Sequence, residues 1–120
     1  MKLGLSALVL IGLTVIPGCG DRSGGYRTTP VTIVNRSSAE ITNVTAKGPG
    51  FSQPVGTIPP GQARQISVQP SGEASLQLEF EAQGKRHTSR PDGYFEGGGS
   101  YQVKATIEAD FSVKVDTQIQ

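Results

Sequence analysis

Apolar and polar residues alternate along most of the chain after residue 30. A period of two is typical of a β-strand with one buried face, because successive side chains point to opposite faces. The clearest run is LQLEFEA at 76–82, in which Gln77, Glu79 and Glu81 separate the apolar positions. No segment after Gly20 shows the three-to-four-residue spacing of an amphipathic helix. The pattern therefore predicts an all-β domain.

Seven segments alternate in this way, and turn-forming residues separate them. Combinations of Pro, Ser, Asp and Gly, as at 59–61, 70–72 and 91–93, favour turns. In the second segment Ile41 and Val44 are three residues apart, which predicts a β-bulge there. The predicted strands are 31–35, 41–46, 62–68, 76–82, 85–89, 101–107 and 111–119.

Each predicted strand has a single apolar face, so two sheets are expected to cover each other's apolar faces. This predicts a β-sandwich of about seven strands, with a closed barrel as the alternative. The side chains predicted to fill its core are Val31, Ile33, Ile66, Val68, Leu76, Leu78, Phe80, Val103, Ile107, Phe111, Val113 and Val115.

The first half of the predicted domain also carries a family resemblance. It begins with VTIVN at 31–35, and IPPG at 58–61 leads into QISV at 65–68. This order, an apolar alternation that ends in Asn and a later Pro-Gly turn into another strand, resembles bacterial immunoglobulin-like accessory modules. The resemblance implies an immunoglobulin-like sandwich and implies no particular activity.

The first nineteen residues follow a different pattern. After Met1 and Lys2, the segment 3–16 (LGLSALVLIGLTVI) is uncharged and largely apolar. It is shorter than the roughly 20 residues that a membrane-spanning helix needs, and its length suits the apolar region of a secretory signal. The segment then ends in Ile16-Pro17-Gly18-Cys19, which resembles the lipobox of bacterial lipoproteins.

That resemblance implies cleavage after Gly18 and a lipid on the sulfur of Cys19. The protein would then be anchored in a membrane of the bacterial cell envelope, because two or more acyl chains give stable anchoring. Gly20, directly after the modified residue, favours the outer membrane over the inner one. A secreted form with an incidental Cys and a retained membrane helix are the alternatives. The expected organisation is a signal peptide at 1–18, a flexible tether at 19–29 and a β-sandwich domain at 30–120.

Composition narrows the possible functions. The chain has 11 basic and 10 acidic residues, a formal net charge of +1, and so lacks the basic surplus of a nucleic-acid-binding protein. A single Cys excludes an internal disulfide framework and a Cys-rich zinc site, and a single His excludes any site that needs two. We therefore expect no metal, no other cofactor and no nucleic-acid partner.

Two groups of residues have side chains that catalysis could use. Ser89 shares a strand face with His87, but the chain has no Gly-x-Ser-x-Gly elbow and two neighbours on one strand do not form a triad. Glu79 and Glu81 also share a face, about 6.5–7 Å apart at the usual strand rise, and a solvent-facing side of the strand explains them. We therefore expect no enzymatic activity and assign no catalytic residue.

Two surface features are candidate contacts with a partner. A basic cluster around His87 suits anionic headgroups, polysaccharide or an acidic protein, and protection of a strand edge is the alternative explanation. Aromatic residues ahead of the glycines at 97–99 suit a contact loop, and a flexible hairpin tip is the alternative. The candidate contact residues are Lys85, Arg86, Arg90, Tyr94, Phe95 and Glu96.

Together these features favour a non-enzymatic envelope lipoprotein, in which a membrane-tethered sandwich binds another envelope component, either a protein or a polysaccharide. The alternative is a small periplasmic inhibitor or immunity protein that acts on a hydrolase. In that case the segment 94–96 would enter the active site of the hydrolase.

Overall fold

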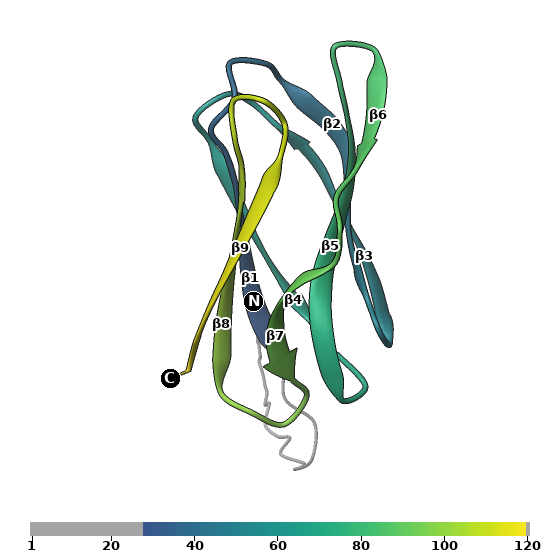
Figure 1. Cartoon of the computed structure of the whole chain (residues 1–120), viewed down its shortest axis with the longest axis vertical. Coiled ribbons are helices and arrows are strands. Elements are labelled where there is room, and N and C mark those ends of the chain that lie inside the picture. The colour runs from purple at the N-terminus through teal and green to yellow at the C-terminus, as the bar shows by residue number, and fades with distance from the viewer. Residues whose placement is uncertain (1–27, 120) are drawn as a thin grey trace, which may run out of the picture.

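The computed structural model describes residues 28–119, which form nine strands in two sheets and contain no helix (Figure 1). The predicted signal peptide, Cys19 and most of the predicted tether lie outside these residues. Within them there is no helix of the length and hydropathy that a membrane span requires. The strands are β1 (Thr29–Asn35), β2 (Ile41–Gly48), β3 (Phe51–Ile58), β4 (Ala63–Val68), β5 (Glu73–Ala82), β6 (Lys85–Thr88), β7 (Asp92–Glu96), β8 (Tyr101–Ile107) and β9 (Val113–Ile119).

The strands form two separate sheets, as a sandwich requires, and not a closed barrel. The first sheet has the order β4-β1-β8-β9, and its β1–β8 pair is parallel while its other pairs are antiparallel. The second has the order β3-β2-β5-β6, and β7 also pairs with β5. β6 pairs with residues 79–82 of β5, and β7 pairs with residues 73–76. β6 and β7 are therefore two pieces of one interrupted edge strand.

Between β6 and β7, Ser89 keeps the chain hydrogen-bonded to β5. Its amide donates to the carbonyl oxygen of Leu78 at 2.9 Å, and its Oγ accepts from the amide of Leu78 at 2.9 Å. The Gln77 side chain donates to the carbonyl oxygen of Ser89 at 2.9 Å. These bonds replace ladder bonds, so the chain can cross from β6 to β7 without leaving the sheet.

Both sheets contribute to a single core of sixteen buried apolar residues. The alternation predicted the inward face correctly, and Phe80, for example, is completely buried. Eight of the twelve predicted core residues are buried, namely Val31, Ile33, Val68, Leu76, Leu78, Phe80, Val103 and Ile107. The other four, Ile66, Phe111, Val113 and Val115, are partly buried against the core.

The number of strands was underestimated, because β3 and β7 were not predicted. β3 carries Pro54 and Gly56, and most of its residues are exposed, so it has no regular alternation. β7 begins at Asp92-Gly93, which the sequence presents as a turn. The predicted bulge in β2 is confirmed, since its register shifts between Ile41 and Val44.

Asn35 joins the two sheets at one end of the sandwich. Its side-chain amide donates to the carbonyl oxygens of Ala39 at 2.8 Å and Ile58 at 2.9 Å. Its Oδ1 accepts from the amide of Ser37 at 2.9 Å and from the hydroxyl of Ser37 at 2.7 Å. The side chain is completely buried, and these four bonds use its full donor capacity and both acceptor positions. It thereby fixes the turn after β1 against the end of β3.

Candidate functional site

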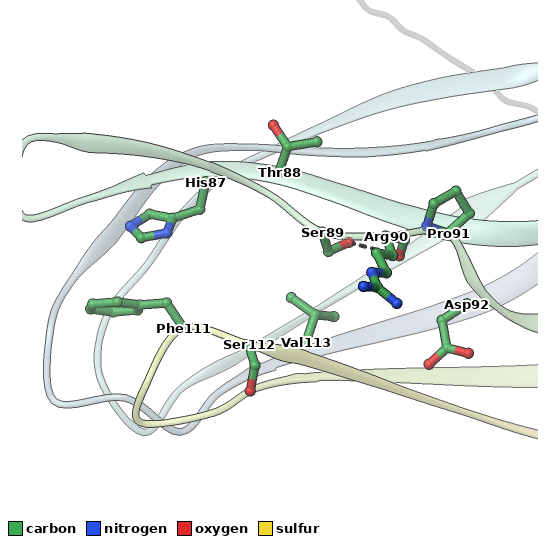
Figure 2. Close-up of a pocket in the computed structure, with 9 residues that line it drawn as sticks. All are labelled: His87, Thr88, Ser89, Arg90, Pro91, Asp92, Phe111, Ser112 and Val113. Atoms are coloured by element: carbon green, nitrogen blue, oxygen red, sulfur yellow. Dashed lines mark hydrogen bonds between the residues drawn. The ribbon is translucent and has the colours of Figure 1, made fainter.

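A groove of about 500 Å³ lies between the edges of the two sheets. Residues 87–92, from the end of β6 to the start of β7, form one wall, and residues 111–113, which lead into β9, form the other. Figure 2 shows the rings of His87 and Phe111 facing each other at one end, with Arg90 and Asp92 toward the other end. The groove therefore has an aromatic end and a charged end.

The aromatic end is a stack of three rings. His87 lies between Phe80, with ring centroids 5.2 Å apart and planes 14° apart, and Phe111, with centroids 4.9 Å apart. The Nε2 atom of His87 is buried and has no hydrogen-bond partner among residues 28–119. The hydroxyl of Ser89 bonds the backbone of Leu78 and Arg90. In this arrangement the imidazole acts as a packing element that connects the core to the groove.

Phe111 holds its place in an unusual backbone conformation. Its φ is +68°, which is rare for a bulky residue and costs about 1–3 kcal/mol. The turn that imposes it is closed by bonds from Phe111 N to Glu108 O at 2.9 Å and from Glu108 N to Ser112 O at 2.8 Å. Contact with His87 offsets the strain, so the ring is held where it borders the groove.

Asp110 stabilises the same turn from outside. Its carboxylate accepts hydrogen bonds from the hydroxyl of Ser112 at 2.6 Å and the amide of Ser112 at 3.0 Å. These two bonds lower the pKa of Asp110 below its ordinary value, because they favour the charged form. The wall of the groove at Ser112 is thus fixed by a carboxylate that the sequence did not single out.

The predicted basic cluster is divided in the structure. Arg86 reaches across the outer face of the second sheet to Glu79 at 2.6 Å and Glu81 at 3.6 Å, and Lys47 reaches Glu79 at 3.1 Å. Hydrogen bonds from Lys47 and then Arg86 lower the pKa of Glu79. These ion pairs show that Arg86, Glu79 and Glu81 are cross-strand partners on the outer face of the sheet. Arg90 lines the groove, whereas Lys85 is exposed beside the β5–β6 turn.

The segment 94–96 is a strand and not a free loop, and one of its predicted contact residues is wrong. Phe95 is completely buried, with its ring centroid 6.2 Å from that of Phe51. It points inward because β7 continues the alternation of the edge beside β5. A buried ring has no surface for a partner, so Phe95 belongs to the core.

Tyr94 and Glu96 face outward from β7. Tyr94 is 46% exposed and meets Tyr101 edge to face, with centroids 6.3 Å apart. The hydroxyl of Tyr101 donates to Glu96 at 3.5 Å. A hydrogen bond with Glu96, followed by partial burial, raises the pKa of Tyr94 to about 12. These side chains form a small aromatic and acidic patch.

Gly97, the first glycine after this patch, packs closely against the backbone of the β4–β5 connection. The amide of Gly97 donates to the carbonyl oxygen of Gly72 at 3.0 Å, and a Cβ on Gly97 would collide with the carbonyl oxygen of Pro70. Tyr94 and Glu96 lie on β7, and Lys85 and Arg86 lie on β6, which pairs with the opposite half of β5 (Figure 1). Arg90 lies between these two strands and lines the groove. The predicted contact residues therefore do not form one surface.

The sequence analysis missed part of the groove. Asp92 and Ser112 gave no signal beyond ordinary turn residues, and Phe111 was predicted only as a core residue. The described residues contain no group of three or more His, Cys, Asp and Glu side chains that could hold a metal ion. In residues 28–119, the groove is a polar and aromatic surface assembled from two sheets.

Comparisons with known proteins concern the fold. No protein-family model matches the chain, and no curated protein sequence matches it. A solved structure, an NMR structure of a protein from Eubacterium rectale, is similar with a TM-score of 0.56. The two sequences are 19% identical, and the similarity covers 84% of this chain and 97% of the other. At this identity the similarity shows a shared all-β fold and nothing about activity.

Proposed function

We propose that this protein is a non-enzymatic lipoprotein of the bacterial cell envelope, in which an immunoglobulin-like sandwich serves as a tethered binding module. Cys19 carries the lipid, Gly18 is the last residue of the signal, and the outer membrane is favoured over the inner one. The groove beside Arg90 binds an envelope protein or polysaccharide. The observation that carries the proposal is the single Cys of the chain, directly after Gly18 at the end of an apolar segment.

The arrangement of the sandwich supports a tether at one end and a binding surface at the other. β1 starts at Thr29 opposite Val68, and it ends at Asn35 opposite Ile107. Ile107 leads into the turn that carries Phe111. An anchor ahead of residue 28 would therefore attach to the end remote from the aromatic end of the groove (Figure 1). The aromatic end of the groove would then lie on the side of the domain remote from the membrane.

The chemistry of the groove supports a polar or anionic ligand. Arg90 is exposed on one wall of the groove, and the opposite wall carries Ser112 and the ring of Phe111 (Figure 2). A guanidinium is suited to carboxylate or phosphate groups because its N–H donors match two oxygens. In the same groove, the ring of Phe111 offers an apolar surface. Carbohydrate and peptide ligands use such a surface together with polar contacts.

The anchor is tested by mass spectrometry of the mature N-terminus together with membrane fractionation of Cys19→Ala. We expect acyl chains on residue 19 of the wild-type protein and loss of Cys19→Ala from the membrane fraction. An unmodified thiol on intact protein in the culture supernatant would contradict the proposal.

The binding surface is tested by capture from detergent-solubilised envelopes with wild-type protein, Arg90→Glu and Lys85→Glu. We expect the reversal at Arg90 to abolish capture and the reversal at Lys85 to leave it unchanged. Equal capture by all three would place the binding surface elsewhere.

The alternative, an inhibitor or immunity protein, has less support from the fold. It was based on insertion of the segment 94–96 into an active site, and this segment is strand β7 with Phe95 in the core. Insertion would require β7 to leave β5. A hydrolase as the dominant captured partner would nevertheless favour that alternative.

A further inference from the structure

The two sheets have four edges, and three of them carry features that prevent pairing with another strand. On β4, the charged Arg64 is opposite Ile33 and so lies on the inward side of the sheet. On β3, Pro54 and the left-handed Gly56, with φ +97°, interrupt the edge. Inward charges, prolines and bulges are common means of blocking an edge.

The third edge, formed by β6 and β7, is blocked by its own interruption. β6 is only four residues long and carries Lys85 and Arg86. The chain then leaves regular pairing at Ser89 and passes through Pro91 before β7 begins. A short, charged and broken edge offers no continuous row of backbone groups.

β9 is neither short nor interrupted, and its two charged residues, Lys114 and Asp116, are of opposite sign and lie on the outward side of the sheet. Its seven residues pair with β8 without a register shift, and they include no Pro, no Gly and no inward-facing charge. Its inward residues Val113 and Val115 are only partly buried, and Ile119 at its end is 77% exposed. Long, regular and partly apolar edges of this kind pair readily with a further strand.

The turn before β9 shows which backbone groups of β9 are not bonded to β8. Glu108 N bonds Ser112 O at 2.8 Å, and bonded and non-bonded pairs alternate along an antiparallel ladder. Counted from this bond, the backbone groups of Val113, Val115 and Thr117 are directed away from β8. These three residues can therefore exchange hydrogen bonds with a new strand.

We propose that the new strand is β9 of a second copy of this chain, antiparallel and centred on Val115. In this register Lys114 of each copy lies opposite Asp116 of the second copy, giving two complementary pairs on the exposed face. A shift of the two-fold axis by one residue would instead place Lys114 or Asp116 opposite itself. Charge complementarity thus selects one register.

The same register covers the apolar residues at both ends of β9. Ile119 of each copy comes opposite Phe111 of the second copy, and Thr117 comes opposite Val113. Ile119 of each copy therefore lies beside the aromatic end of the other copy's groove. In this dimer the β9 edge of each copy is paired with the other, so the assembly closes with two-fold symmetry and does not grow into a filament.

The experiment uses two charge reversals in the full chain, Lys114→Asp and Asp116→Lys. Sedimentation velocity is measured over a range of concentrations, in detergent with a large excess of micelles over protein so that shared anchoring is rare. We expect wild-type dimers, and we expect each single reversal to raise the dimer Kd at least about tenfold, because two attractive pairs become repulsive.

Mixing the two variants gives the sharpest outcome. Lys114→Asp and Asp116→Lys chains are complementary to each other in this register, so their equimolar mixture should dimerise about as tightly as wild type. Recovery on mixing also shows that both variants are folded. Lys85→Asp, a reversal on a different edge, is the matched control and should dimerise like wild type.

Three results would each overturn the proposal. They are a wild-type protein that stays monomeric across the range, single reversals that dimerise as well as wild type, and a mixture that dimerises no better than its components. The test does not depend on lipidation, since a chain that lacks the lipid can be measured in the same buffer.

Discussion

The two ends of the sandwich are closed by different means. At the end that carries the β1–β2 and β8–β9 connections, the upper end in Figure 1, side chains make the closure. Asn35 of β1 bonds the end of β3, and His87 lies between Phe80, on which it stacks, and the tilted ring of Phe111. At the lower end, the backbone itself packs closely, because Gly97 lies against Pro70 and has no side chain. The upper end therefore depends on side-chain contacts, whereas the lower end depends on the close approach of backbone atoms.

Among the substitutions at the upper end, Phe80→Ala should lower the free energy of unfolding most. Phe80 is completely buried and supports the stacked ring of His87, so its loss leaves a cavity beneath the groove. We expect the free energy of unfolding to fall by about 3–5 kcal/mol, measured by denaturant titration. A loss below about 1 kcal/mol would mean that the ring is not in the core.

Asn35→Ala removes the buried side-chain hydrogen bonds at the same end of the sandwich. The carbonyl oxygen of Ile58 and the amide of Ser37 lose the bonds from Asn35, and the carbonyl oxygen of Ala39 keeps only its bond from the Ser37 hydroxyl, and unsatisfied buried groups are costly. We expect a loss of about 2–4 kcal/mol in the free energy of unfolding. Ser37→Ala is the control, and it should cost less because Asn35 keeps its bonds to Ala39 and Ile58.

Gly97→Ala tests whether the lower end depends on close backbone packing. The new methyl group would collide with the carbonyl oxygen of Pro70, and we expect a loss of about 1–3 kcal/mol from overpacking. Gly99→Ala is the matched control, since its methyl group meets only the side chain of Tyr101. Equal thermal stability of the two variants would show that the lower end is not tightly packed.

A comparison of Phe111→Ala with Phe111→Gly sharpens the account of the groove wall. Both variants lose the contact with His87, but only Gly is relieved of the strain at φ +68°. Phe111→Gly should therefore be more stable than Phe111→Ala by about 1 kcal/mol in denaturant titration. The opposite order would mean that the turn changes its conformation when the ring is removed.

The smallest effect concerns pH. The pKa of Asp110 is lowered in the folded protein by its bonds with Ser112, so its contribution is present above the unfolded pKa. That contribution is lost as the pH falls through the folded pKa, which lies below the usual value of about 3.9. Thermal unfolding at a series of acidic pH values should show a weaker pH dependence for Asp110→Asn than for wild type.

The sequence predicted those parts of the fold that depend on periodicity. Inward residues such as Ile33 and Phe80 were correct, because alternation with polar residues determines which face is buried. β3 was missed because Pro54 and Gly56 occupy an edge, where a strand needs only one bonded side. β7 was missed because it begins at Asp92-Gly93, which is typical of a turn, and because its pairing with β5 leaves no pattern in the sequence.

The candidate site was less predictable for a related reason. The partners of Arg86 depend on the register between β5 and β6, and the groove depends on how two sheet edges meet. The sequence shows neither of these relations. Phe95 illustrates the limit, since its aromatic neighbours suggested a contact surface while its position in the sheet places it in the core.

The position of β1 has a mechanical consequence. β1 lies inside its sheet, bonded to β4 on one side and in parallel to β8 on the other. A pull on residue 28 against a load at the far end of the sandwich would act along both ladders, so their hydrogen bonds would share the force. A pull on Ile119 would instead peel β9 from β8 one bond at a time. The domain is thus built to resist tension at its first strand and to yield at its last.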